Sequence, residues 1–165
     1  MINRTHPLHD LLARRGKTPT GIPSFCTANE RVLTAILRAA ACNGRLALIE
    51  ATANQVNQFG GYTGMRPADF AARVYAIAKE VGCDSAQIIL GGDHLGPLTF
   101  AQENEESAMQ KAEDLVREYV LAGFSKIHLD TSMKLGGDGT GALSKNVVAR
   151  RGARLCIAAE EAFEE

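Results

Sequence analysis

Ile88–Pro97, which reads Ile-Ile-Leu-Gly-Gly-Asp-His-Leu-Gly-Pro, is the stretch from which the fold can be inferred. Its apolar start predicts a buried strand, and the closing Gly-Pro pair predicts the end of that strand. Asp93 and His94 are therefore expected where a strand of a parallel α/β sheet passes into its loop, which is where such folds carry their chemistry. Gly91 and Gly92 have no Cβ atom, so a ligand or a neighbouring strand can approach the backbone closely.

Similar strand patterns recur along the chain, and each is followed by a helical pattern. Strands are also predicted at 22–27, 46–51 and 126–131, and helices at 8–15, 29–43, 67–82, 101–122 and from about 144 to the end. Four successive βα units predict a parallel sheet with right-handed crossovers. A complete (β/α)8 barrel needs about 250 residues. The 165 residues therefore fit either a small open four-stranded sheet or the first half of a barrel.

The fourth predicted strand has one polar face. Ile127 and Leu129 alternate with Lys126, His128 and Asp130, so the two sets fall on opposite faces. A parallel sheet covered on both sides is expected to be apolar on both faces. The polar face therefore predicts a barrel interior or the wall of a site. Glu50, near the carboxyl end of the second strand, is a further candidate site residue.

Two loops have unusual compositions. The loop at 52–65 carries four side-chain amides, Asn54, Gln55, Asn57 and Gln58, together with glycines and aromatic residues. Amides both donate and accept hydrogen bonds, which suits sugar hydroxyls; the alternative is a loop that satisfies its own backbone. The second loop, at 136–141, is rich in glycine, so it is either a phosphate cradle ahead of a helix or a mobile connector.

The composition is that of an ordinary globular domain. The chain is 45% hydrophobic and 22% charged, with a net charge of -1, which favours neither nucleic acid nor an anionic membrane as a partner. The segment at 1–7 has no apolar run typical of a signal peptide, and no run approaches the roughly 20 residues that span a bilayer. The expected location is therefore cytoplasmic. The four cysteines are scattered without a CxxC pair, so no cysteine metal site is expected.

Three motifs give the chain a family resemblance: 54–65 (Asn-Gln-Val-Asn-Gln-Phe-Gly-Gly-Tyr-Thr-Gly-Met), 91–97 (Gly-Gly-Asp-His-Leu-Gly-Pro) and 126–133 (Lys-Ile-His-Leu-Asp-Thr-Ser-Met). They resemble the non-catalytic subunit of class II D-tagatose-1,6-bisphosphate aldolase, the GatZ/KbaZ family, which is also labelled a tagatose-6-phosphate kinase. The resemblance implies a (β/α)8 TIM barrel. Because family members are longer, residues 1–165 would form a single partial (β/α) barrel domain of about the first four βα units, an N-terminal fragment of the full protein.

The resemblance also implies roles for individual residues. The family is similar to the catalytic class II aldolases, in which an Asp-His pair at a strand end supplies an acid/base and a zinc ligand. By that likeness Asp93 would be the catalytic carboxylate and His94 a metal ligand. His128, on the polar face of its strand, is either a second metal ligand or substrate contact, or a hydrogen-bonded core residue, so the Zn²⁺ ligand set is incomplete. Two positions depart from the family pattern: Asn29 stands where relatives carry a histidine, and Phe100 stands where Trp is expected.

Two functions remain open at this point. The first is an accessory subunit that binds and stabilises the catalytic aldolase subunit during breakdown of tagatose 6-phosphate, galactitol or N-acetylgalactosamine. The second is a zinc-dependent sugar phosphate aldolase or epimerase in its own right. In either case the expected substrate-binding residues are Glu50, Asn54, Gln55, Asn57, Gln58, Lys126, Asp130 and Ser132. A kinase receives no support, because the sequence contains no GxxxxGK[ST] loop.

Overall fold

Four parallel strands form the centre of the molecule. The computed structural model describes residues 6–19 and 21–165. The strands are β1 (Ser24–Cys26), β2 (Ala47–Thr52), β3 (Ile88–Leu95) and β4 (Lys126–Leu129), hydrogen-bonded in the order β1-β2-β3-β4. Doubly wound sheets reverse their strand order, whereas barrels keep it sequential. The predicted partial barrel, with four of eight βα units, is therefore the architecture observed.

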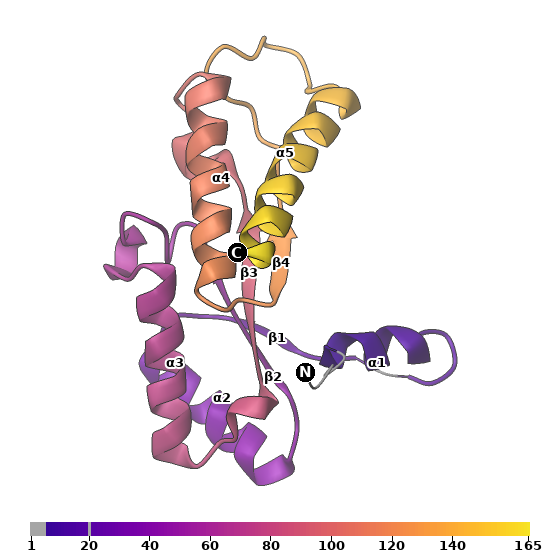
Figure 1. Ribbon diagram of the computed structural model, residues 1–165, viewed down its shortest axis with the longest axis vertical. Helices are drawn as coiled ribbons and strands as arrows, with labels where there is room; N and C mark the ends of the chain where they lie inside the picture. The colour runs from indigo at the N-terminus through magenta and orange to yellow at the C-terminus, as the bar shows by residue number, and fades with distance from the viewer. Residues whose placement is uncertain (1–5, 20) are drawn as a thin grey trace.

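Each strand is followed by a helix. These helices are α2 (Glu30–Asn43), α3 (Pro67–Val81), α4 (Glu105–Leu121) and α5 (Lys145–Glu164), and α1 (Pro7–Arg14) precedes the sheet. The described residues also include three single-turn 3₁₀ helices, η1 (Gly61–Thr63), η2 (Ser85–Gln87) and η3 (Pro97–Phe100). In Figure 1, α2 and α3 lie together at one end of the molecule, α4 and α5 lie together at the other, and α1 extends away from the body.

Several predicted boundaries require correction. Asp93 and His94 lie at the carboxyl end of β3, where the strand passes into its loop as predicted, and the strand itself extends to Leu95. The predicted strand at 22–27 is shortened to Ser24–Cys26. The helix predicted from residue 101 begins at Glu105, because η3 occupies the preceding segment and the Asn104 side chain accepts the hydrogen bond that caps α4. The residues at 1–5, for which no apolar signal segment is expected, lie outside the described residues.

The hydrophobic core lies between the sheet and the helices. β2 and β3 are almost wholly buried, as parallel strands covered by helices should be. The helices pack their apolar stripes against these strands, and the fully buried side chains include Leu33, Leu37, Phe70, Val74, Ile77, Leu115, Tyr119 and Leu155. β1 and β4, at the two edges of the sheet, are partly exposed along their length. No helix in the described part of the chain is long and apolar enough to cross a membrane.

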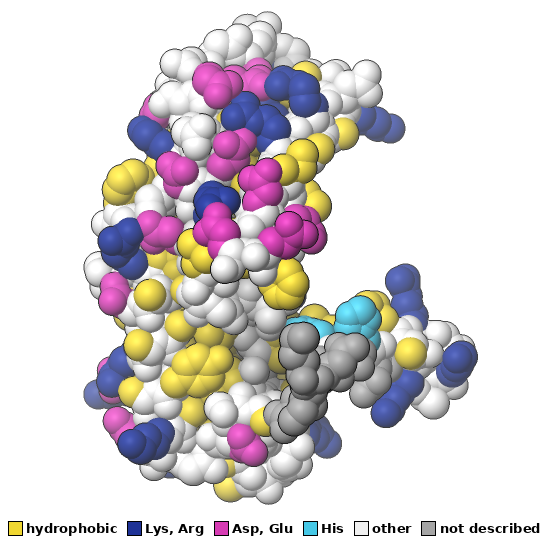
Figure 2. Space-filling view, viewed as in Figure 1, with side chains coloured by type: hydrophobic (Ala, Val, Ile, Leu, Met, Phe, Trp, Pro, Cys, Tyr) yellow, Lys and Arg dark blue, Asp and Glu magenta, His cyan; other side chains and the backbone are white. Residues whose placement is uncertain are grey.

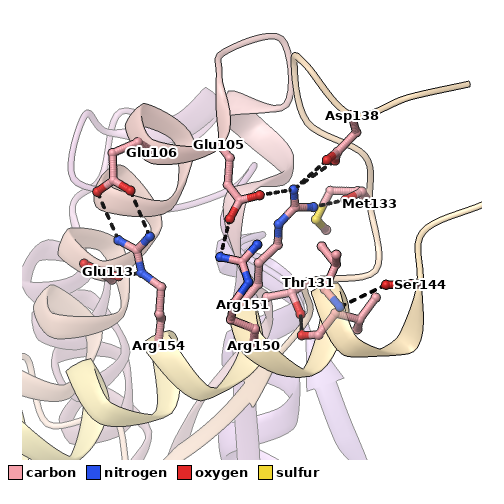
Figure 3. A network of polar contacts seen from close by, with 12 residues as sticks. Glu105, Glu106, Glu113, Thr131, Met133, Asp138, Ser144, Arg150, Arg151 and Arg154 are labelled. Atoms are coloured by element: carbon pink, nitrogen blue, oxygen red, sulfur yellow. Dashed lines mark hydrogen bonds and ion pairs between the residues drawn. The ribbon is translucent and has the colours of Figure 1, made fainter.

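A network of ion pairs joins α4, α5 and the loop after β4 (Figure 3). Arg151 of α5 is fully buried and donates to Glu105 of α4 at 2.7 Å and to Asp138 of the loop at 2.8 Å. Its Nη1 also reaches the Met133 carbonyl at 3.4 Å. One turn further along α5, Arg154 pairs with Glu106 and Glu113 of α4. Asp138 therefore ties the loop at 136–141 to α5, and Arg151 links it in turn to α4.

We expect the substitution Arg151→Met to lower the free energy of unfolding by about 2 kcal/mol, because two carboxylates lose the cation that neutralises them. Removing one partner of a wholly buried ion pair lowers the free energy of unfolding by about 3–5 kcal/mol. The expected loss is smaller here because Glu105 and Asp138 keep contact with water. Urea denaturation followed by circular dichroism measures the change.

The matched control is Arg150→Met, because Arg150 pairs with the same Glu105 but is 54% exposed. Exposed ion pairs contribute at most about 1 kcal/mol, so this variant should unfold close to the wild-type midpoint. Equal losses in the two variants would contradict the role assigned to the buried guanidinium.

Candidate functional site

An ion pair crosses the interior face of the sheet where three strands stand in register. Glu50 of β2, Gly91 of β3 and Lys126 of β4 are paired side by side. The Lys126 ammonium donates to the buried Glu50 carboxylate and approaches the Gly92 carbonyl at 3.5 Å. A Cβ atom at position 91 would lie 2.7 Å from Oε1 of Glu50. Gly91 is therefore needed because the pair passes directly over its backbone.

A β-bulge two residues further along β3 gathers the chemistry-bearing side chains. Gly92 pairs with Ile127 and Leu95 with Leu129, so Asp93 and His94 together oppose the single residue His128. Regular alternation would point Asp93 and His94 to opposite faces. His94 instead has a φ of 51°, in the left-handed region, which a bulge accommodates. Both side chains are thereby directed at His128.

Asp93 lies at the centre of this cluster. Nδ1 of His94 and Nδ1 of His128 each lie 3.0 Å from Oδ1 of Asp93. The two imidazole rings are 4.2 Å apart between centroids and are tilted by 53°. The donor atoms of Asp93, His94 and His128 all fall within 4.8 Å of one another. The structure thus brings together the predicted acid/base and both predicted metal ligands.

The electrostatics of the cluster favour an ionised Asp93. Partial burial acts to raise its pKa, but hydrogen bonds from His128 and Cys26 and the nearby charges of His94 and Lys126 outweigh burial, so the pKa lies below its ordinary value. Burial and the adjacent Asp93 raise the pKa of the Cys26 thiol to about 11. Cys26 is therefore a protonated neighbour of the site. Sequence reasoning missed it, although its place at the carboxyl end of β1 was a usable signal.

Asp130 and Ser132 follow β4 next to the cluster. The Asp130 carboxylate accepts the backbone N–H of Ser132 at 2.9 Å. Burial acts to raise the pKa of Asp130, but the bonds from Ser132 and the nearby charges of His94 and His128 hold it below its ordinary value. The Asp130 N–H donates to the Leu95 carbonyl at 2.8 Å. The neighbouring Gly96 lies so close to Asp130 that a Cβ atom there would stand 1.8 Å from its carbonyl oxygen.

The amide-rich loop mostly bonds its own backbone. Oε1 of Gln55 accepts the Thr52 N–H at 2.8 Å. Asn57 is buried, donates to the Ala53 carbonyl and accepts from the N–H groups of Phe59 and Gly61. Gln58 donates to the Lys111 carbonyl of α4. The side chain of Asn54 is exposed. These contacts match the alternative of a self-satisfied loop, and only Gln55, 3.5 Å from the Cys26 thiol, borders the cluster.

The cluster has the donor set of a metal site. Two imidazoles and one carboxylate from neighbouring strands match the three protein ligands that a catalytic zinc ion takes, with a fourth position left for water or substrate. A metal would require both imidazoles to be neutral and the carboxylate to be ionised. Without a metal, the same Asp93 carboxylate can accept or return a proton, with two imidazoles to orient it. The arrangement therefore suits either metal binding or proton transfer.

Comparisons with known proteins give consistent matches. A family model described as D-tagatose-1,6-bisphosphate aldolase subunit GatZ/KbaZ-like matches residues 8–165. The D-tagatose-1,6-bisphosphate aldolase subunit GatZ of Salmonella agona is 55% identical over 145 residues, which cover 88% of this chain and 34% of that protein. The GatZ subunit of an Escherichia coli strain is 56% identical over 140 residues, covering 85% and 33%.

A solved structure agrees with these relatives. The crystal structure of "a probable tagatose 6 phosphate kinase" from Sinorhizobium meliloti superposes with a TM-score of 0.83 and 48% identity, over 87% of this chain and 37% of that chain. The chain thus spans about a third of the length of the curated relatives it matches.

We expect Gly96→Ala to lower the free energy of unfolding by about 3 kcal/mol or more, because the new methyl group meets backbone rather than a movable side chain. The ends of β3 and β4 would have to separate, which displaces Asp130 from the cluster. The matched control is Gly139→Ala, where a Cβ atom meets nothing within 4 Å; a change within about 1 kcal/mol is expected there. Urea midpoints that fall equally in both variants would refute the close approach at Gly96.

Proposed function

The chain belongs to the GatZ/KbaZ-like family of D-tagatose-1,6-bisphosphate aldolase subunits, and from this we propose that it acts as an accessory, non-catalytic subunit of a class II aldolase. In this role it would bind the catalytic subunit and support its activity and stability. The reaction served is cleavage of tagatose 1,6-bisphosphate to glyceraldehyde 3-phosphate and dihydroxyacetone phosphate, in the cytoplasm, during tagatose 6-phosphate, galactitol or N-acetylgalactosamine catabolism. The observation that carries the proposal is the family match over residues 8–165.

Two features of the site support an accessory role. The Glu50 carboxylate is already neutralised by Lys126, and most amides of the loop after β2 are engaged with backbone groups. The Glu50–Lys126 pair and these loop amides therefore already have partners within the protein and do not form an open sugar-binding site. Contact with a sugar phosphate is assigned to the predicted set: Glu50, Asn54, Gln55, Asn57, Gln58, Lys126, Asp130 and Ser132. Among these residues, Asn54 and Ser132 are exposed.

The donor cluster favours a second candidate, a zinc-dependent sugar phosphate aldolase or epimerase. His94 and His128 would hold Zn²⁺ beside Asp93. A zinc ion polarises a ketose carbonyl and stabilises the enediolate that results. Asp93, ionised and oriented by two imidazoles, would move the proton of the C4 hydroxyl. The relative from Sinorhizobium meliloti is described as a probable kinase. We propose no kinase activity for this chain, because its sequence contains no GxxxxGK[ST] loop that would support one.

The accessory role predicts that this chain changes the behaviour of a catalytic class II tagatose-bisphosphate aldolase subunit. Cleavage of tagatose 1,6-bisphosphate is measured for the catalytic subunit with and without the chain, and for the chain alone with Zn²⁺. We expect a several-fold rise in rate or half-life of the catalytic subunit and no cleavage by the chain alone. Zinc-dependent cleavage by the chain alone would overturn the accessory role, and no effect in either arm would refute both the accessory role and the aldolase alternative.

The metal assignment predicts a loss of zinc affinity in site variants. Calorimetric titration of the chain with Zn²⁺ should show one site, and His128→Ala or Asp93→Asn should weaken it by about 100-fold or more, since even residues that only support a metal ligand contribute 10–100-fold. The control is His9→Ala, because His9 lies on α1 and is not one of the clustered donors. Affinity that falls equally in the control, or not at all in the site variants, would show that the cluster does not hold the metal.

A further inference from the structure

One carboxylate oxygen of Asp93 is shared by two imidazole rings. Nδ1 of His94 and Nδ1 of His128 each lie 3.0 Å from Oδ1 of Asp93, which is an ordinary length for a hydrogen bond between nitrogen and oxygen. The ionised Asp93 carboxylate can only accept hydrogen bonds, so a ring nitrogen that bonds to it must carry a proton. Both Nδ1 atoms are therefore hydrogen-bond donors.

The proton on Nδ1 decides what the other ring nitrogen can do. A neutral imidazole carries one N–H, so Nε2 keeps its lone pair when Nδ1 is protonated. The two nitrogens of the five-membered ring point in different directions, so Nε2 of each ring faces away from Oδ1 of Asp93. A lone pair on a neutral imidazole nitrogen is the donor that zinc takes from histidine.

We propose that Asp93 is a positioning residue that presents the Nε2 atoms of His94 and His128 to a zinc ion, and that it is not itself a ligand. Histidine ligands of metals commonly donate their second ring N–H to a carboxylate, which fixes the tautomer and the ring orientation. Here one carboxylate oxygen does so for two rings. The inference rests on the zinc site of the second candidate function and goes further by naming the atoms that bind the ion.

The distances favour this assignment over a site in which Asp93 binds the ion. Ligand atoms around a tetrahedral zinc ion stand about 3.3 Å apart, because each lies about 2.0 Å from the metal. The two separations of 3.0 Å are shorter, and both hydrogen bonds would be lost if zinc took their place. Coordination through Nε2 leaves both bonds intact. Oδ2 of Asp93 takes part in neither bond and stays available for proton transfer.

His6 provides the opposite case within the same chain. Its Nδ1 accepts the backbone N–H of Leu8 at 3.3 Å, and its Nε2 lies 3.0 Å from the Ser125 hydroxyl. Nδ1 of His6 therefore carries no proton, and the expected tautomer is Nε2–H. Figure 2 shows histidine side chains (cyan) on the surface beside α1. The chain has four histidines, so the ring signals of each can be assigned by substitution.

The first experiment records long-range ¹H–¹⁵N correlation spectra of the metal-free, ¹⁵N-labelled chain at a pH where the ring signals are those of neutral imidazoles. These spectra show which ring nitrogen carries the proton. We expect Nδ1–H at His94 and His128 and Nε2–H at His6. An Nε2–H tautomer at either clustered histidine would overturn the proposal.

Two variants test whether Asp93 sets the tautomers. Asp93→Ala removes the shared acceptor, and both rings should change to Nε2–H, the tautomer that a histidine without such a partner favours. The matched control is Asp130→Ala, because Asp130 is a second carboxylate near both rings but bonds to Ser132. This control should keep Nδ1–H at both rings, and circular dichroism confirms that each variant is folded. Tautomers that persist in Asp93→Ala, or change equally in both variants, would contradict the role.

The last step adds Zn²⁺ to the labelled wild-type chain. We expect the Nε2 signals of His94 and His128 to move on zinc binding while both Nδ1 atoms keep their protons. Loss of the Nδ1 protons with zinc bound would overturn the proposal and leave the zinc site itself in place. Unchanged ring signals at both residues would refute the zinc site and this proposal together, whereas neither result bears on the accessory role.

Discussion

One extra residue in β3 decides where the chemistry of this molecule lies. Between Gly92 and Leu95 the strand is one residue longer than its partner, and His94 takes a left-handed conformation to accommodate it. A regular strand would send the Asp93 carboxylate and the His94 ring to opposite faces. The bulge places both against His128, so the donor cluster and the low pKa of Asp93 follow from this local departure from regular pairing.

The register of the three strands before the bulge is equally specific. Glu50 and Lys126 meet over Gly91, and only glycine leaves room for them. On the inner face of the sheet the positive charge of Lys126 is balanced by the negative charge of Glu50, which explains why the fourth strand has a polar residue at position 126. This arrangement is compatible with both candidate functions. The Glu50–Lys126 ion pair leaves no uncompensated charge beneath the donor cluster, whether the cluster binds a metal or the chain acts as an accessory subunit. The two candidate functions differ in whether Asp93 transfers a proton, and the structure around Asp93 is the same in both.

Much of the fold could be read from the sequence, since helix periodicity, caps at Asn29 and Ser144, and apolar strand runs are local signals. The convergence of Asp93, His94 and His128 was expected from strand polarity and from family resemblance. The bulge was not foreseen, because register shifts depend on the partner strand. Arg151 was not foreseen either: its partners Glu105 and Asp138 are distant in sequence, and a charged residue in a helix reads as solvent-facing. The amides of the 52–65 loop gave no sign of whether they would face ligand or backbone.

The left-handed backbone at His94 has an evolutionary consequence. Glycine and asparagine tolerate that conformation at least as well as histidine, so a single substitution can delete the imidazole while the bulge and the strand register persist. The proposed metal ligand and the architecture can therefore change independently of each other at this position. The proposed metal site can be lost or regained through one side chain, and two relatives that differ in this way would share the same fold.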